Sequence, residues 1–332
     1  MIFSKIGFLL LLSIAVSPVY AQQVNTWNDT SPHTIQFVTV EKNVQLEVLD
    51  WGGIGKPIVL LAGGGNTAHV FDDFAPKLSA NFHVYGITRR GFGSSQFSAI
   101  DSQDRLGKDI LAVIDSLEII KLVLVGHSIA GAELSSVAHI SPDHISALVY
   151  LEAGYPYAFS NGESPAMKEF MEINGPKQPT PEEKDLVSFK ALQKWDAKTF
   201  GFQRPESEFR QTWDSTLEGR PTHPRNSPGF SMFSTILNDP IKYDSIPVTS
   251  LVIFAIPHVK EAWMTESTDQ KVRSDAQIYF TKIDNLATKQ AKAINDGVPA
   301  AEVMKLQGMH YIYLTNELEI LNAISQFVSR LK

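Results

Sequence analysis

Apolar runs and amphipathic segments alternate along most of the chain. Residues Thr34 to Val40 and Val44 to Trp51 change between apolar and polar with the two-residue period of a half-buried strand. The alternation of later segments predicts a mainly parallel, doubly wound α/β sheet with helices on both faces. Its apolar runs are Ile58 to Leu61, Phe82 to Ile87, Leu122 to Val125, Ile145 to Leu151, Val248 to Ala255 and Val303 to Leu306, and its amphipathic segments include Asp104 to Leu117 and Glu317 to Leu331.

The interval from Ala153 to Ile246 lacks the apolar run of a buried strand. Its segments Ser164 to Glu172, Thr180 to Phe200 and Glu206 to Thr216 have helical patterns instead. An interval of this length is too long for a simple connection within a compact domain. We therefore predict a helical cap over residues 153–246, inserted into a core made of residues 22–152 and 247–332.

The first residues have the pattern of a secretory signal peptide. Lys5 precedes the apolar run Ile6 to Val16, and small residues follow up to Ala21. The apolar run is shorter than the roughly 20 residues of a membrane-spanning helix. We expect residues 1–21 to be a signal peptide, cleaved after Ala21, and the mature protein to be exported to the periplasm or the medium without a membrane anchor.

Composition narrows the possible chemistry. The chain has no cysteine, which excludes disulfides, a thiol nucleophile, thiolate metal ligands and an acylated-cysteine anchor. The net charge of −7 argues against nucleic acid as a partner, so the expected partner is a small-molecule substrate. The sequence does not indicate an oligomeric state.

The segment Gly126-His127-Ser128-Ile129-Ala130 has the pattern of a nucleophile elbow. It joins the apolar run ending at Val125 to a helical stretch beginning at Ala130. A nucleophilic serine at such a sharp turn needs small residues two positions away on either side. Ala130 stands where the pattern has its second glycine, and Gly131 follows directly. The alternative for Ser128 is an ordinary helix-capping serine.

A glycine-rich turn, Gly63-Gly64-Gly65, follows the apolar run Ile58 to Leu61. Backbone N–H groups brought close by glycines can stabilise the oxyanion that forms during acyl transfer. We predict that the Gly64 N–H, with Gly65 as the alternative, and the Ile129 N–H form an oxyanion hole. A phosphate-binding loop is disfavoured because the turn lacks the Lys-Ser/Thr end of a P-loop.

His310, in Gly308-Met309-His310, follows the last apolar run and is the candidate general base. A serine hydroxyl needs a base that titrates near neutral pH, and histidine is the residue that supplies one. His258 is the main competitor because it stands just past the run Val248 to Ala255.

These motifs, together with Thr88-Arg89-Arg90-Gly91-Phe92-Gly93-Ser94-Ser95, stand in an order that resembles the α/β-hydrolase fold superfamily over about residues 34–331. The resemblance implies a triad in the order serine, acid, histidine. In most members the acid follows the strand assigned to Val248 to Ala255, but here His258 stands there and the nearest carboxylate is Glu261. Some members place the acid one strand earlier, where this chain has Glu152. We choose Glu152, with Glu261 as the alternative.

The predicted reaction is hydrolysis of a carboxylic ester through an acyl-enzyme on Ser128, which needs neither a metal nor an organic cofactor. Iminopeptidase, amidase, lactone and thioester hydrolysis use the same core and are alternatives. A protein that binds a ligand without catalysis is the alternative from another class.

Overall fold

The computed structural model describes residues 27–239 and 243–331, so the predicted signal peptide lies outside the described residues. The main sheet has eight strands in the order β1-β2-β4-β3-β5-β6-β9-β10. Their bounds are β1 (Thr34–Glu41), β2 (Val44–Asp50), β3 (Pro57–Leu61), β4 (His83–Ile87), β5 (Leu122–His127), β6 (Ile145–Leu151), β9 (Ser250–His258) and β10 (Ala301–Gly308). Only the pairs β1·β2 and β2·β4 are antiparallel. The predicted mainly parallel sheet is confirmed.

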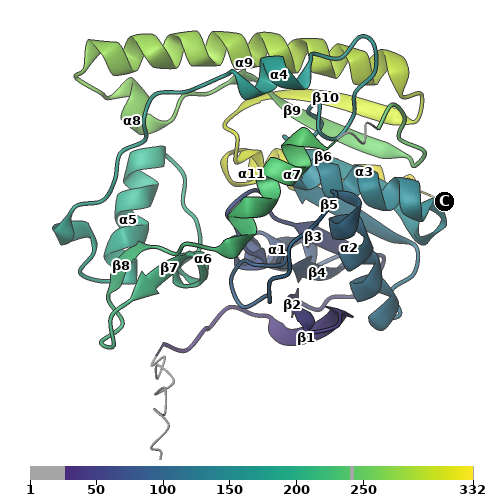
Figure 1. Ribbon diagram of the computed structural model, residues 1–332, viewed down its shortest axis with the longest axis horizontal. Helices are drawn as coiled ribbons and strands as arrows, with labels where there is room; N and C mark the ends of the chain where they lie inside the picture. The colour runs from purple at the N-terminus through teal and green to yellow at the C-terminus, as the bar shows by residue number, and fades with distance from the viewer. Residues whose placement is uncertain (1–26, 240–242, 332) are drawn as a thin grey trace, which may run out of the picture.

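Helices cover both faces of this sheet (Figure 1). Outside the interval 153–246, the described helices are η1 (Ala68–Phe71), α1 (Ala75–Leu78), α2 (Asp104–Ser116), α3 (Ala130–Ile140), η2 (Pro142–His144), α8 (Ala262–Thr265), α9 (Gln270–Gly297), α10 (Ile312–Thr315) and α11 (Glu317–Ser329). Apolar side chains of α2, α3 and α9 pack in one large core, whereas those of η1, α1 and α11 pack in a second core on the other face. Within the described residues, no helix is long and apolar enough to cross a membrane.

The register of the central strands brings their following loops together. Leu61 of β3 lies opposite Gly126 of β5, and His127 of β5 lies opposite Leu151 of β6. The strands therefore end at nearly the same level, and Ala62, Ser128 and Glu152 follow them at one edge. Carboxyl ends of parallel strands are where open α/β sheets build their sites.

The interval 153–246 contains α4 (Met167–Met171), η3 (Glu183–Asp185), α5 (Phe189–Phe200), α6 (Glu206–Thr212), β7 (Trp213–Ser215), β8 (Pro221–Pro224), η4 (Pro228–Phe230) and α7 (Ser231–Asn238). In Figure 1, α5, α6, β7 and β8 form a lobe beside the main sheet, whereas α4 lies against α9. The assignment of the whole interval as a cap stays a prediction.

Two helical predictions in this interval need correction. The helix expected from Glu206 to Thr216 ends at Thr212, and Trp213 to Ser215 form a strand paired with β8. The Thr212 carbonyl accepts a hydrogen bond from the Arg225 N–H, so this end of the helix is satisfied by the hairpin. The helix expected from Thr180 to Phe200 begins only at Phe189, because the Ser188 side chain caps it by accepting from the Ala191 N–H.

Candidate active site

Ser128 lies at a tight turn between β5 and α3. Its φ is +55°, in the left-handed region that non-glycine residues rarely adopt. Two backbone hydrogen bonds hold the turn, from the Ser128 N–H to the Leu151 carbonyl at 3.1 Å and from the Gly131 N–H to the Ser128 carbonyl at 2.9 Å. Such a conformation costs free energy and persists at sites where the surrounding structure enforces it. The local geometry is that of a nucleophile elbow rather than of an ordinary helix cap.

The space around the elbow explains why Ala130 is tolerated. A Cβ added at Gly126 would lie 3.1 Å from the Ala130 Cβ and 3.0 Å from Leu134, so Gly126 leaves room for the alanine methyl group. A Cβ added at Gly131 would lie only 1.9 Å from the Ala153 carbonyl oxygen. The position that requires glycine after the nucleophile is therefore 131, one residue later than the sequence pattern.

His310 lies between Ser128 and Glu152. Its Nε2 is 3.0 Å from Ser128 Oγ, and its Nδ1 is 3.3 Å from Glu152 Oε2. With the proton on Nδ1, the imidazole donates to the carboxylate and accepts from the serine hydroxyl, which is the arrangement of a general base. The structure thus brings together three of the predicted residues from the ends of β5, β6 and β10.

Glu152 is fully buried and surrounded by donors. It accepts hydrogen bonds from the Ala255 N–H at 2.7 Å and from the Tyr155 hydroxyl at 2.8 Å, in addition to its histidine contacts. Burial alone would raise the pKa of Glu152, but hydrogen bonds and charge from His258 and His310 outweigh it and hold the pKa well below its usual range. The carboxylate therefore stays ionised beside His310.

Glu261, the alternative acid, lies elsewhere. Its Oε2 accepts a hydrogen bond from Trp263 Nε1 at 2.6 Å, and no hydrogen bond joins it to His310 in the described part of the chain. Its partly buried carboxylate lines the cavity in front of Ser128. Of the two candidates, only Glu152 is positioned to orient the imidazole.

The predicted oxyanion loop lies against the elbow. A Cβ added at Gly63 would lie 3.2 Å from the Ser128 Cβ, and one added at Gly64 would lie 3.7 Å from Ile129 Cγ2. Within the described residues, neither the Gly64 N–H nor the Ile129 N–H donates a hydrogen bond to another protein group. Both predicted donors are therefore available close to the nucleophile, and the Gly65 N–H remains the alternative.

Buried polar contacts support this loop from two sides. Arg89 Nη2 donates to the Ala62 carbonyl at 2.8 Å while its guanidinium is paired with Glu133. On the other side, Glu208 of α6 accepts from Asn66 Nδ2 at 2.8 Å and from Thr67 Oγ1 at 2.5 Å. The segment after the glycines is thereby attached to the interval 153–246.

A family model described as alpha/beta hydrolase fold matches residues 56–231, more than half of the chain. The chain belongs to the α/β hydrolase fold family.

Individual relatives are distant and match only in part. A superfamily protein of Bacillus subtilis strain 168, YisY, is 28% identical over 154 residues, covering 42% of this chain and 57% of that protein. A probable esterase of Oryza sativa subsp. japonica is 32% identical over 124 residues, covering 36% of this chain and 45% of that protein. The matched region covers as little as 26% of a curated relative's own length. A solved esterase from Rhodococcus sp. ECU1013 shares the fold with a TM-score of 0.58 and 14% identity, covering 90% of this chain and 99% of that one. The fold and the esterase names support a hydrolase.

His258 has an unexpected place in this α/β hydrolase. The sequence presented it as a rival base, but its Nε2 lies 3.2 Å from Glu152 Oε2, behind the carboxylate, and its Nδ1 lies 2.6 Å from Asp284 of α9. Burial lowers the pKa of His258, yet the two carboxylates outweigh burial and raise it above its ordinary value. The sequence analysis missed Asp284, because nothing near it in the chain marks it as a partner of His258.

His127, adjacent to the nucleophile, has a supporting position. Its Nε2 donates to the His310 carbonyl at 3.0 Å. Burial, followed by the nearby His310, lowers the pKa of His127 to about 3, so its imidazole is neutral at ordinary pH. His127 therefore holds the backbone of the candidate base without acting on Ser128.

A cavity of about 410 Å³ opens in front of Ser128. Its walls come from the end of β6, the segment after α4 and one side of α9, with aromatic side chains Tyr155, Tyr157, Phe170, Tyr279 and Phe280. Among the described residues that line it, the carboxylates and imidazoles are Glu152, His258, Glu261 and His310, and there is no lysine or arginine. The cavity in front of Ser128 thus combines aromatic walls with acidic and imidazole groups.

Proposed function

We propose that this α/β hydrolase cleaves carboxylic esters of small molecules through an acyl-enzyme on Ser128. The observation that carries the proposal is the continuous contact from Ser128 Oγ through His310 to the buried Glu152 carboxylate, built on a serine with positive φ. Esterase names among the relatives agree with it.

In the proposed reaction, His310 takes the proton of Ser128 as the serine oxygen attacks the ester carbonyl. The Gly64 and Ile129 N–H groups stabilise the oxyanion, and Glu152 stabilises the imidazolium. His310 then gives its proton to the leaving alcohol, and the acyl group stays on Ser128. Water, activated by the same histidine, releases the acid and restores the serine.

A second candidate is cleavage of an aminoacyl ester or amide. The observation that favours it is Glu261, a partly buried carboxylate in a cavity whose described lining has no lysine or arginine. Burial raises the pKa of Glu261, and a bound ammonium group would compensate for that desolvation. This candidate uses the same nucleophile and base.

The test is a hydrolysis screen of the mature protein with p-nitrophenyl esters of several chain lengths beside aminoacyl anilides. We expect turnover of short esters, and Ser128→Ala and His310→Ala should each lower it by several orders of magnitude. Labelling of Ser128 by a fluorophosphonate separates an enzyme from an inert binding protein. Near-native turnover by both variants would show that the site assignment is wrong.

Export to the periplasm or the medium remains a prediction from the sequence. Fractionation of cells that express the full-length chain, with mass analysis of the mature N-terminus, tests it. A mature chain that begins at Gln22 is the expected result.

A further inference from the structure

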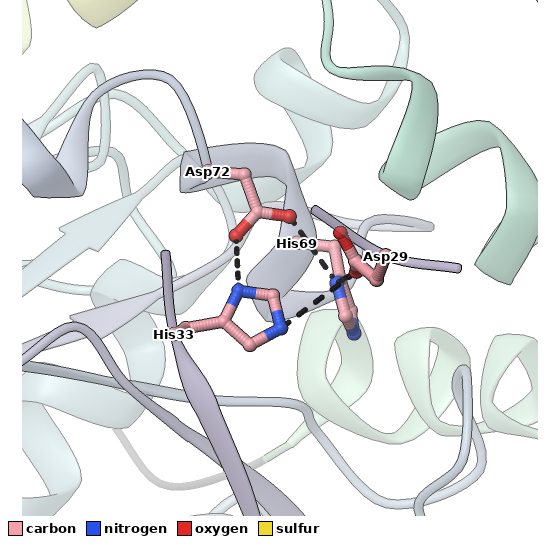
Figure 2. A group of neighbouring side chains, drawn as sticks. All are labelled: Asp29, His33, His69 and Asp72. Carbon is pink, nitrogen blue, oxygen red and sulfur yellow. Dashed lines mark hydrogen bonds and ion pairs between the residues drawn. The ribbon is translucent and has the colours of Figure 1, made fainter. Parts of the chain in front are cut away.

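A second cluster of ionisable side chains lies near the start of the described chain. Asp29 and His33 precede β1, His69 lies in η1, and Asp72 directly follows η1. Figure 2 shows the four side chains converging, and one ligand-type atom from each lies within 4.8 Å of the others. The side chains of His33, His69 and Asp72 are almost completely buried, whereas Asp29 keeps 19% of its surface exposed. None of these residues belongs to the proposed catalytic machinery.

Hydrogen bonds account for only part of this cluster. Asp72 Oδ1 accepts from His33 Nδ1 at 2.8 Å and from Trp51 Nε1 at 3.1 Å. In contrast, Asp29 Oδ2 lies 3.7 Å from His33 Nε2 and 3.6 Å from His69 Nδ1, too far for hydrogen bonds. Two ligands of one tetrahedral zinc ion, with bonds of about 2.0 to 2.1 Å, lie about 3.3 to 3.4 Å apart. The two separations from Asp29 Oδ2 are within about 0.4 Å of that value.

His69 has two carboxylate oxygens facing one ring nitrogen. Its Nδ1 is hydrogen-bonded to Asp72 Oδ2 at 3.2 Å and also lies 3.6 Å from Asp29 Oδ2. A lone pair on Nδ1 would repel both oxygens, and a single proton there can be donated to only one of them at hydrogen-bond distance. One cation placed among the three atoms can attract all of them.

In each histidine, the ring nitrogen that does not face Asp29 also lies near a carboxylate. His69 Nε2 is buried without a hydrogen-bond partner among the described residues and lies 3.6 Å from Glu47 Oε1. His33 Nδ1 contacts Asp72 Oδ1 while its Nε2 faces Asp29. Histidines that ligate a metal usually donate their other N–H to a carboxylate or carbonyl, which orients the ring.

We propose that Asp29, His33, His69 and Asp72 bind one divalent transition-metal cation, with Zn²⁺ as the best match. Two imidazole nitrogens and two carboxylate oxygens suit tetrahedral zinc, whereas Mg²⁺ and Ca²⁺ prefer ligand sets made of oxygen alone. Four protein ligands complete the coordination, so the ion has a structural role. The competing arrangement is a metal-free cluster in which His69 is protonated and paired with Asp72.

Binding at this site would join three parts of the molecule. Asp29 and His33 come from the segment before β1, whereas His69 lies in η1 and Asp72 directly follows it. Asp72 Oδ2 also accepts from the Ser207 hydroxyl of α6 at 2.5 Å, which extends the link to the interval 153–246. We expect the cation to stabilise the native state and not to take part in ester cleavage.

The experiment uses the mature protein after dialysis against a chelator, titrated with Zn²⁺ by equilibrium dialysis with elemental analysis. We expect one tightly bound equivalent per chain and a rise in Tm of about 4 °C at a hundredfold excess over the dissociation constant. Co²⁺ should give the intense visible spectrum of a four-coordinate ion. Absence of stoichiometric binding by the wild-type protein would overturn the proposal.

Matched variants locate the ion. Asp29→Asn and His33→Gln should each weaken Zn²⁺ binding by at least about tenfold. His83→Gln is the control, because His83 is paired with Asp50 outside the cluster. His310→Ala should also retain zinc. Unchanged affinity in Asp29→Asn and His33→Gln, or loss of zinc in His310→Ala alone, would place the ion elsewhere and disprove this site.

Discussion

His258 and Glu152 contact each other across the ends of β9 and β6, with His258 Nε2 3.2 Å from Glu152 Oε2. His258 stands where the family resemblance leads one to expect the acid. Its second contact, with Asp284, places the imidazole between two carboxylates. Both carboxylates favour the protonated form of His258 and raise its pKa, and we infer that His258 is a positioning residue for Glu152.

This relationship predicts that Glu152 is the more important of the two candidate acids. Glu152→Gln removes the charge that stabilises the imidazolium of His310 and should lower kcat by about a thousandfold. Glu261→Gln should leave kcat on neutral esters little changed, because Glu261 is bonded to Trp263. Steady-state kinetics of the two variants on one p-nitrophenyl ester compares them. A larger loss at Glu261 would reverse the assignment.

The charge on His258 should be visible in the pH dependence of activity. The groups that face it are Glu152, Asp284, His310 and the cavity carboxylate Glu261, with Tyr155 bonded to the same Glu152 oxygen. A protonated His258 opposes a second positive charge on His310. His258→Gln removes this opposition, so the pH dependence of activity should change.

The expected result for His258→Gln is an acidic limb of the kcat/KM profile moved up by about one pH unit. His83→Gln, at the distant pair with Asp50, should leave the limb in place. A role confined to packing would lower kcat/KM equally at every pH. An unmoved limb in His258→Gln would therefore contradict the proposed positioning role.

The geometry of the elbow predicts that a substitution is costly at position 131 and tolerated at the adjacent position 130. Gly131→Ala places a Cβ 1.9 Å from the Ala153 carbonyl oxygen and should lower the free energy of unfolding by about 1 to 3 kcal/mol. Ala130→Gly restores the usual pattern and should cost less than about 1 kcal/mol. Urea unfolding measures both. Equal costs would show that the steric argument for position 131 is wrong.

Glu208 should support the oxyanion loop from the interval 153–246. It is buried and accepts from Asn66 and Thr67, and burial raises its pKa. Glu208→Gln places an amide NH₂ group, which can only donate, near the donors of Asn66 and Thr67. We therefore expect the oxyanion loop to shift and kcat to fall by about tenfold. The matched control is Glu206→Gln, on the same helix, whose carboxylate pairs with Arg210 nearer the surface. Equal kinetics for the two variants would exclude this role for Glu208.

Much of the fold and part of the site follow from the sequence alone. Continuous apolar runs identified the buried strands, because a parallel strand covered on both faces has no solvent-facing side to make polar. Small residues around Ser128 indicated the elbow, and the position of His310 after the last strand made it the candidate base. These signals are local, since each depends on a few neighbouring residues and their backbone geometry.

Contacts between segments that are far apart in the sequence could be identified only from the tertiary structure. From their positions in the sequence, Glu152 and Glu261 were both candidates for the triad acid. Only the arrangement of the ends of β6 and β10 shows that Glu152 is the one that contacts His310. The same holds for Asp284, which reaches His258 from a helix far along the chain, and for Trp213 to Ser215, which leave the helix because a later strand pairs with them. The four-residue cluster of Figure 2 unites residues before β1 with η1 and the residue that follows it. Sequence thus predicted most of the elements and the candidate nucleophile, whereas packing between elements decided which side chains meet, because charge and hydrogen bonding act over a few ångströms of space.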